Sequence, residues 1–567
     1  MKYIKVLLLS FVLSAVFSTA QAQVYVNGHI APFDKETNTW LATIAENQFG
    51  KDNLLTVSLQ DGWNQITIEG IVVVDGQYTF KHISAESRYE TTVTNAEGNK
   101  IKGTIQFTFL PLVYLEGNFG YDYEPGTVTI ASPEEQVNDI ILSGRIKWRG
   151  KTTNTDDKHK RNYNLKFDED IQLFDMRKDN SWMLDAGQPD VFRMRNRIAM
   201  DIWNDMASKP YYAYQEPKAR NGVRGRMVEV FLNDEYRGIY NLSEKLDRKQ
   251  LKIKKVDESG NIHGILYKGI TWENTSMNDS IYNYDNYAYN LLGYEVKYPK
   301  PGDDCDSTDW KPFMDANNNI IILCYDDEAF EKQIEEWLDV PVMIDYGVFL
   351  SSVNALDNSG KNMFWAIYDK ETSNRMTLAP WDLDCTFGQR WGGSLINAEN
   401  DLTSPSHLSD VVIAGFFNFN RTNALHFNDR LNERYQELRQ NGNVLSTDSL
   451  IKRFTKYYNA IKHSGAAQRE IDKWSGDSDI KGEEIDFDKE YEYICDWITK
   501  HMEAVDKKGF PLVYDKEYMD SIFARIDNKI ITNKGDNHIY TLSGQRVNST
   551  KPLKHGIYII NKKKVIY

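Results

Sequence analysis

The sequence predicts an α+β fold in three parts: an N-terminal β-sandwich, a central domain of strands and helices, and a small β-rich tail. Three observations lead to this prediction. Residues 23–108 contain short β-rich segments separated by turn residues. Residues 109–528 begin with strands and end with long stretches of helical spacing. Residues 536–567 return to short β-rich segments with turn residues between them.

Composition indicates a folded, acidic protein. The chain has 567 residues, of which 41% are hydrophobic and 13% aromatic, so it can form cores of ordinary size. Its formal net charge of −15 disfavours a nucleic-acid-binding protein, which usually carries a basic footprint. The cysteines contain no CxxC pair, so a structural zinc site is not expected. One disulfide, such as Cys305–Cys324, and free thiols both remain open; the other two cysteines are Cys385 and Cys495.

The first 22 residues are typical of a secretory signal peptide. A basic MKYIK segment precedes the apolar run VLLLSFVLSAVF, and Ala20-Gln21-Ala22 supplies the small-residue cleavage pattern. The apolar run is short for a membrane-spanning helix, and no later segment reaches that length. We therefore expect a secreted, periplasmic or cell-surface protein with no transmembrane helix beyond the signal peptide.

The N-terminal sandwich is predicted from five segments rich in β-branched and aromatic residues, with DG and AEGNK as turns. The segments are NLLTVSL, NQITIEGIVVV, GQYTF, RYETTVTN and KGTIQFTFL. Such a domain is a candidate binding site for a cell-surface glycan or a protein.

The central domain begins with strands at LVYLEG, IILSGRIKWRG and NYNLKFD, and the polar loop KTTNTDDKHKR separates the last two. Apolar residues at helical spacing predict a helix in VFRMRNRIAMDIWNDM. A hairpin turning at Asn233-Asp234 follows. Residues 272–319 are rich in Asn, Tyr and Asp, which predicts an insertion or long loop. Helical spacing returns at Asp326 and again from about residue 410 to 528.

The segment LAPWDLDCTFG places two acidic residues in an apolar run. If MTLAPWDLD is a strand that pairs back onto MFWAIYD, alternation puts Asp382 and Asp384 on one face. Two carboxylates on one face repel each other unless a cation lies between or beside them. A calcium site, a pair of hydrolase acids and a solvated edge are the other interpretations of this motif.

A second polar motif, DNSGKN, lies before that hairpin. Asp357 and Asn362 follow an apolar helix, and the order of helix, Asp, Asn five residues on, hairpin and further Asp is that of protein kinases. Asp and Asn supply the oxygen ligands that Mg²⁺ prefers. Upstream, Lys166 lies on a strand face opposite Tyr163 and Leu165, where a kinase-like site needs a phosphate-binding cation.

These motifs resemble the spore-coat protein H (CotH) kinase family, which is an atypical protein-kinase-like family. The resemblance covers about residues 109–500 and rests on KWRGKTTN, NYNLKF, SWMLDAGQPDVFRMRNRIAMDI, VEVFLNDEYRGIYNLSEKLD, ALDNSGKN and LAPWDLDCTFG. It implies a two-lobed kinase-like domain over residues 109–528. Lys151 and Thr152-Thr153 stand where the family commonly has Asn and two serines.

The resemblance also implies roles for individual residues. Asp357 is the catalytic residue, and Asn362, Asp382 and Asp384 bind the metal. Lys166 binds phosphate, Arg149 and Gly150 begin a loop over the nucleotide, and Glu244 lies near the adenine. Arg195 and Asn196 lie in a helix that supports Lys166.

The implied function is a secreted protein kinase that transfers the γ-phosphoryl group of ATP to Ser or Thr, with Mg²⁺ or Mn²⁺, on a protein of unknown identity. The alternative is a non-enzymatic surface module that binds carbohydrate or protein and carries an inactive kinase-like domain. A hydrolase using Asp382 and Asp384 ranks last, because glycosidases need acids on either side of the scissile bond. The tail resembles those of secreted Bacteroidetes proteins through IYTLSGQRV and GIYIINKKKVI, and a sorting signal and a plain hairpin both remain open.

Overall fold

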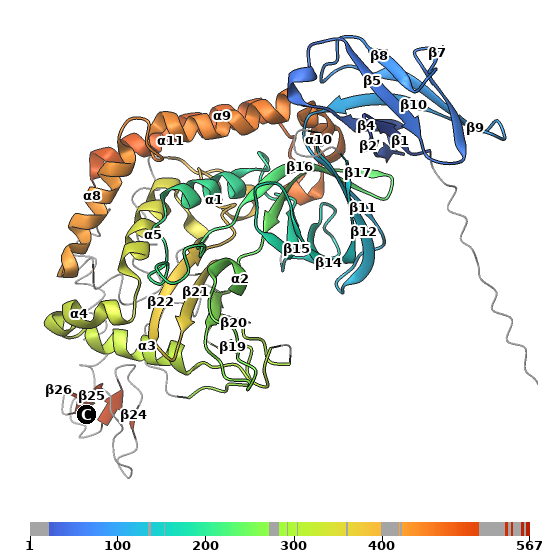
Figure 1. The fold of residues 1–567 in the computed structure, drawn as a ribbon. Helices are drawn as coiled ribbons and strands as arrows, with labels where there is room; N and C mark the ends of the chain where they lie inside the picture. Colours follow the sequence, from blue (N-terminus) through green and yellow to red (C-terminus); the bar gives the residue numbers. More distant parts are fainter. Residues whose placement is uncertain are drawn as a thin grey trace, which may run out of the picture.

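The computed structural model confirms a fold of mixed strands and helices (Figure 1). It describes residues 22–133, 138–151, 153–271, 283–291, 293–302, 304–358, 361–398, 419, 422–509 and four short strands between residues 539 and 566. Residues 1–21 of the predicted signal peptide lie outside the described residues. Within the described ranges, no helix is both long and apolar enough to cross a membrane.

Two β-sheets form the N-terminal part, drawn in blue in Figure 1. The smaller sheet has the order β2 (His29–Ala31), β1 (Val24–Val26), β5 (Asn53–Leu59) and β8 (Gln77–Phe80). The larger has the order β3 (Phe33–Asp34), β4 (Thr39–Thr43), β10 (Lys100–Thr108), β9 (Tyr89–Asn95), β6 (Trp63–Ile68) and β7 (Ile71–Val72). One core containing Trp40, Phe80 and Phe107 lies among these strands. The segments form strands because alternate residues reach this core, as in β5 and β9.

A closed barrel of seven strands follows. Its order is β11 (Leu112–Glu116), β12 (Glu124–Ala131), β13 (Ile140–Arg149), β14 (Asn162–Gln172), β15 (Lys178–Asp185), β17 (Glu235–Glu244) and β16 (Gly225–Leu232). Parallel pairing of β11 with β16 closes the ring. In β14, Tyr163, Leu165 and Phe167 are buried while Asn164 and Lys166 are half-buried, so the predicted alternation is present. The β16–β17 hairpin turns at Asn233-Asp234, also as predicted.

A five-stranded sheet lies beside the barrel. Its order is β19 (Asn290–Leu291), β20 (Tyr294–Tyr298), β18 (Ile265–Gly269), β21 (Met363–Asp369) and β22 (Ser373–Pro380). In the chain, helix α1 (Arg195–Met206) lies between the barrel strands β15 and β16, and the one-turn helix α2 (Arg248–Leu251) lies between β17 of the barrel and β18 of this sheet. The sheet and the helices around it share one large core, in which Trp365 and Trp310 are buried.

The prediction of one long loop over residues 272–319 is wrong for two described parts of that range. Residues 290–298 form β19 and β20, and α3 (Lys311–Leu323) begins well before residue 319. In β20 the buried residues Tyr294, Val296 and Tyr298 alternate with charged ones, so the strand signal was present within a polar segment. In α3, a run of three asparagines obscured an apolar face.

The second half of the chain is mainly helical, as predicted. Its helices are α4 (Asp327–Gln333), α5 (Val340–Val353), α8 (Phe427–Arg439), α9 (Thr447–His463), α10 (Ala466–Trp474) and α11 (Phe487–Lys508). Side chains at the N-caps explain where two of them begin: Ser446 accepts from the backbone N–H of Ser449, and Asp486 accepts from that of Lys489. The predicted helical residues 510–528 lie outside the described ranges.

The tail strands pair in the order β24 (Arg546–Val547), β23 (Ile539–Thr541), β25 (Ile557–Ile560) and β26 (Lys563–Ile566). The residues of its two predicted turns lie outside the described ranges. Cys305, Cys324, Cys385 and Cys495 form no disulfide within the described residues, so of the two alternatives left open the structure has thiols.

A buried charge cluster joins helix α10 to the barrel. The carboxylate of Glu470, which is fully buried, accepts hydrogen bonds from Lys160 Nζ at 2.6 Å and Arg193 Nε at 2.8 Å. Its second oxygen accepts from the backbone N–H of Ile239 in β17 at 2.7 Å. Burial lowers the pKa of Lys160 to about 7, although the nearby Glu470 acts in the opposite direction. The cluster therefore connects a loop and a strand of the barrel to the C-terminal helices.

Candidate active site

The segment that carries Asp382 and Asp384 is a loop, which corrects the expectation of a returning strand. Strand β22 ends at Pro380, and Asp382 has a left-handed backbone with φ of 58°. Strand alternation therefore does not determine where the two carboxylates point. Leu383 is fully buried in the core while Trp381 is half-buried, so the loop is anchored by its apolar members.

The DNSGKN motif packs directly against this loop. Asp357 lies in a short 3₁₀ turn (Leu356–Asn358) after α5, and Asn362 Nδ2 donates to its Oδ2 at 2.8 Å. Lys361 Nζ lies 3.0 Å from the same oxygen. The backbone N–H of Trp381 donates to the carbonyl of Asn362, and Asn358 Nδ2 donates to the carbonyl of Trp381. The structure thus brings together the two motifs that the sequence placed about twenty residues apart.

Helix α1 supplies a connection that sequence reasoning did not use. Asn196 Oδ1 accepts from the backbone N–H of Leu383 at 3.0 Å, and its Nδ2 donates to Asp185 Oδ2 at 2.7 Å. Asp185 is the last residue of β15, so Asn196 links the barrel to the Asp382 loop. Asp185 is a site residue that we did not predict. Its only signal was an acid at the end of an apolar strand, SWMLDAG, within a family-like motif.

The carboxylates of this region act on one another. Burial, followed by the charges of Asp382, Asp357 and Asp185, raises the pKa of Asp384 well above its usual range. The pKa of Asp382 is raised by the same kinds of cause, while Arg149 and Lys268 oppose the rise. The rise is larger at Asp384 than at Asp382, where the two cations act in the opposite direction. Four acids with few cations beside them repel one another, and a bound divalent cation would relieve that repulsion.

Two cations lie over Trp381, the residue next to Asp382 in the chain. The guanidinium of Arg149 lies over the ring of Trp381, 5.4 Å from its centroid, and Lys268 Nζ lies 5.8 Å from that centroid. Burial, and then the charge of Lys297, lowers the pKa of Lys268 to about 8. The pocket beside Asp382 also contains apolar side chains; its lining includes Arg149, Met183, Asp185, Asn196, Met200, Trp381 and Asp382.

Lys166 lies in the barrel strand β14, and no ion pair within the described residues joins it to these acids. Its Nζ donates to Asn180 Oδ1 at 2.9 Å, and the residue pairs in register with Ser181 of β15. Lys245 Nζ lies 3.3 Å from Ser181 Oγ, so two lysines flank one serine. Arg195 does not support Lys166 as expected, because its guanidinium binds Asp190 and Glu490 instead.

Two further predicted residues have mainly local contacts. Gly150 has φ of 113°, and a Cβ there would lie 2.2 Å from Thr153 Oγ1, so the turn after β13 requires glycine. The carboxylate of Glu244 is buried and accepts from the backbone N–H groups of Arg177 and Arg224. Its oxygens are therefore used within the protein rather than presented to a ligand.

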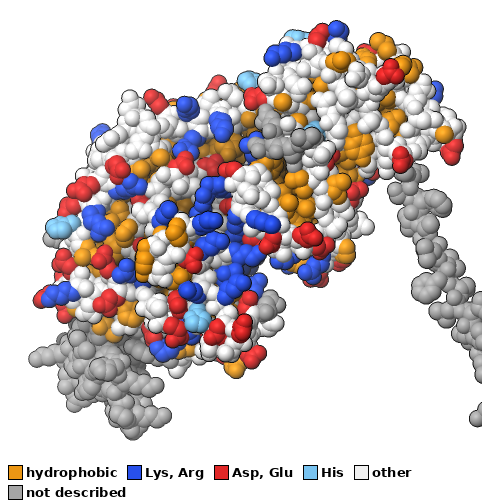
Figure 2. Space-filling model, in the orientation of Figure 1, with side chains coloured by type: hydrophobic (Ala, Val, Ile, Leu, Met, Phe, Trp, Pro, Cys, Tyr) orange, Lys and Arg blue, Asp and Glu red, His pale blue; other side chains and the backbone are white. Residues whose placement is uncertain are grey.

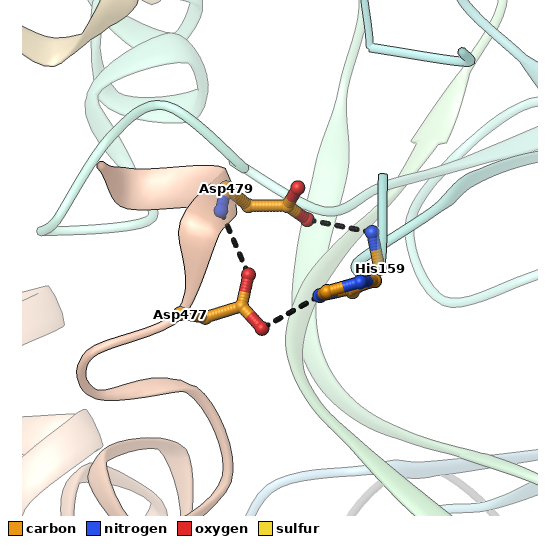
Figure 3. Close-up of side chains that lie close together, drawn as sticks. All are labelled: His159, Asp477 and Asp479. Carbon is orange, nitrogen blue, oxygen red and sulfur yellow. Dashed lines mark hydrogen bonds and ion pairs between the residues drawn. The ribbon is translucent and has the colours of Figure 1, made fainter. Parts of the chain in front are cut away.

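Hydrogen bonds hold the loop between β13 and β14 at the end that precedes β14. His159 Nδ1 lies 2.8 Å from Asp477 Oδ2, and the backbone N–H of His159 donates to Asp479 Oδ2 (Figure 3). The backbone N–H of Lys160 donates to the same oxygen. Within the described residues, these three are the only His, Cys, Asp or Glu side chains whose ligand atoms all lie within 4.8 Å of one another. Because hydrogen bonds already occupy oxygens of both aspartates, we interpret the group as structural: its hydrogen bonds hold this loop against the 3₁₀ turn at Ser478–Ile480.

Comparison with known families identifies the chain at this point. A family model described as CotH kinase protein matches residues 146–505, from strand β13 through helix α11. The chain belongs to the CotH kinase family. The matched range contains every element of the site described above, whereas the N-terminal sheets and the tail lie outside it. A search of curated proteins found no match. Membership of the CotH kinase family supports a kinase-like function.

Proposed function

We propose that this CotH family protein is a protein kinase that transfers the γ-phosphoryl group of ATP to a Ser or Thr hydroxyl of a protein. The observation that carries the proposal is a group of interacting acids with cations beside it. The charges of Asp382, Asp357 and Asp185 act on Asp384, and Arg149 and Lys268 oppose the rise in the pKa of Asp382. A complex of a divalent cation with a triphosphate carries charges that match the acids and the cations.

The residues present fit Mg²⁺ or Mn²⁺. Asp382, Asp384 and Asn362 offer hard oxygen donors, and Mg²⁺ is usually held by one or two carboxylates together with phosphate oxygens and water. When bound, the ion supplies positive charge for the phosphate oxygens during transfer. The elevated pKa of Asp384 is consistent with such a site, because that carboxyl has too little positive charge beside it in the protein alone.

Asp357 is placed to act on the acceptor. Its carboxylate is held by Asn362 at 2.8 Å and Lys361 at 3.0 Å, which restricts its rotation. In this role Asp357 orients the Ser or Thr hydroxyl and accepts its proton as the oxygen attacks phosphorus.

On the barrel side, Arg149 and Lys166 bind phosphate oxygens, and the Gly150 turn lets the following loop cover the nucleotide. We further propose that the protein is exported, on the basis of its leader pattern. Because ATP is scarce outside the cytoplasm, we expect phosphorylation to occur before or during export, or to use another phosphoryl donor.

The test uses the full chain with labelled ATP, Mg²⁺ or Mn²⁺ and a casein-type acceptor. We expect transfer by the natural protein and none by Asp357→Ala or Asp382→Ala. A thermal shift with Mg²⁺-ATP should persist in Asp357→Ala, which acts on the hydroxyl, and disappear in Asp382→Ala, which binds the metal. Absence of both transfer and the shift in the natural protein would reject the proposal in favour of a binding module.

A further inference from the structure

The connection between the barrel and the five-stranded sheet is strongly basic in an otherwise acidic chain. The segment EKLDRKQLKIKK, residues 244–255, contains six Lys or Arg residues and two acids, against a net charge of −15 for the whole protein. Both acids are used internally. Glu244 accepts from backbone N–H groups, and Asp247 accepts two hydrogen bonds from the Arg177 guanidinium at 2.9 Å. The positive charge of this segment is therefore not balanced by its own acids.

Only some of these cations have partners that explain them. Lys249 pairs with Asp179 at 2.7 Å, and Lys254 lies over the ring of Tyr368. No ion pair within the described part of the chain joins a carboxylate to Lys245, Arg248, Lys252 or Lys255. Lys252 and Lys255 are exposed to solvent. Surface cations are usually interspersed with acids, so a run of cations without carboxylate partners indicates a surface that binds an anion.

Strand β20 adds a further cation to the same surface. The guanidinium of Arg248 lies over the ring of Tyr298, 5.6 Å from its centroid, and the backbone N–H of Val256 donates to Tyr298 Oη at 2.7 Å. Exposed Lys300 follows two residues later. Its charge helps to lower the pKa of Lys245 to about 8, where burial is the main cause. We name Lys245, Arg248, Lys252, Lys255 and Lys300 the basic strip. Figure 2 shows Lys and Arg side chains gathered over the region of α2.

We propose that the basic strip is a docking surface for an acidic segment of the protein acceptor, an inference that rests on the proposed kinase function. The strip begins at Lys245, whose Nζ lies 3.3 Å from Oγ of Ser181, the register partner of Lys166, and it continues through α2. An acidic segment bound there would hold the acceptor near the site while a separate hydroxyl reaches Asp357. Docking of this kind raises the effective concentration of the hydroxyl and lowers KM without changing the chemical step.

A short acidic polypeptide fits the strip better than a nucleic acid does. The strip offers no exposed aromatic ring for base stacking, since Tyr298 is 8% exposed and lies against Arg248. A long polyanion would also extend beyond the strip onto a protein of net charge −15. An acidic segment of a few residues matches the local charge and avoids that repulsion.

The binding test needs no nucleotide. Fluorescence anisotropy would measure a labelled Glu-Gly repeat decapeptide on the full chain, with a Gln-Gly repeat as the neutral control. The variant Lys252→Asn/Lys255→Gln/Lys300→Gln removes three exposed charges, and Asn suits position 252 because its φ is 55°. The matched control Lys51→Gln/Lys100→Gln/Lys102→Gln removes three exposed charges from the N-terminal sheets. We expect the strip variant to lose at least about fivefold in affinity, and the control variant to bind as the natural chain does.

Kinetics then separate this inference from the proposed function. With an acceptor peptide that carries an acidic tail, the strip variant should raise KM about fivefold and leave kcat unchanged; with a neutral acceptor both should stay the same. Equal loss in the two triple variants, or no binding of the Glu-Gly peptide, overturns the docking surface. Tighter binding of an oligonucleotide of equal charge overturns it in favour of nucleic acid. Peptide binding without any phosphoryl transfer would leave the surface intact and reject only the kinase.

Discussion

The charge cluster at Glu470 should make a large contribution to stability, and Glu470→Gln tests it. The substitution keeps the shape of the side chain and one acceptor oxygen, so Ile239 or Arg193 can still donate to it. It removes the only carboxylate that bonds both Lys160 and Arg193, which are each about 1% exposed. Breaking a buried pair from one side usually costs about 3–5 kcal/mol, because a charge is left without a partner.

The pH dependence of that cost identifies its cause. Lys160 has a pKa of about 7 in the folded protein and 10.5 as a free side chain, and loss of Glu470 lowers the folded value further. Above pH 7, Lys160 is therefore largely neutral in both proteins and needs no counter-charge. Below pH 7, Lys160 gains a proton, and only the natural protein has the carboxylate of Glu470 to balance its charge. The cost of Glu470→Gln should thus be about 3 kcal/mol at pH 7, larger at pH 6 and smaller at pH 8.5.

Hydrogen exchange of α10 and β17, read by mass spectrometry, measures this cost locally in a protein too large for two-state unfolding. Asp496→Asn, which removes an exposed partner of Lys500, is the control and should cost less than about 1 kcal/mol. Adding Lys160→Met to Glu470→Gln should recover part of the loss, because one unpaired cation is removed. A loss below 1 kcal/mol at pH 7, or one that grows as pH rises, would refute the reasoning.

Three further predictions concern the site and the helices around it. Asp384→Asn should stabilise the metal-free protein by about 1–3 kcal/mol by removing one of the mutually repelling acids, yet abolish the thermal shift with Mg²⁺-ATP; a destabilised variant would contradict this. Asn196→Leu should weaken Mg²⁺-ATP binding about tenfold in calorimetry, because Leu383 and Asp185 lose their shared partner, whereas Asn204→Leu on the same helix should not. Buried His501 donates through Nε2 to the carbonyl of Ser351 and has its pKa lowered to about 4 by burial, so the folded state binds fewer protons than the unfolded one between pH 4 and 6.5. Acidification from pH 7 to 4.5 should therefore cost the natural protein about 2.5 kcal/mol more than His501→Gln, measured by hydrogen exchange of α11 at each pH, and equal losses would contradict the assignment.

Local patterns predicted the strands and helices well where one face is buried. NLLTVSL and MFWAIYD are strands over the residues expected, and the helix predicted around Ile198 and Ile202 forms α1. The failures come from segments whose buried residues are diluted by polar ones, such as β20 and α3. Closure of the barrel was also not predictable, because the pairing of β11 with β16 joins strands more than a hundred residues apart.

The site shows the same division between local and non-local information. The order of Asp357, Asn362, Asp382 and Asp384 could be found from spacing, because they lie within twenty-eight residues of each other. Asp185, Lys268 and Asn196 come from other elements, and only the fold brings them to the Asp382 loop. The strand argument for Asp382 was wrong in its geometry, since a left-handed residue ends the alternation, yet the charge of Asp382 still raises the pKa of Asp384.

A function in ligand binding explains why this site contains charges that lower the stability of the folded protein. A folded protein loses free energy by holding like charges close together, and replacing any one of the four acids by a neutral residue relieves part of that cost. The cations have a similar property, since burial lowers the pKa of Lys268 to about 8 and no ion pair within the described residues joins it to a carboxylate. An excess of carboxylates beside such cations matches a ligand with both signs of charge, such as a complex of a divalent cation with a triphosphate. If the domain only bound a glycan or supported a fold, the acids and the cations would not bind one ligand together. Removing an acid would then leave ligand binding unchanged. The response of Asp384→Asn to Mg²⁺-ATP therefore distinguishes the kinase from the binding module more directly than any measurement of stability alone.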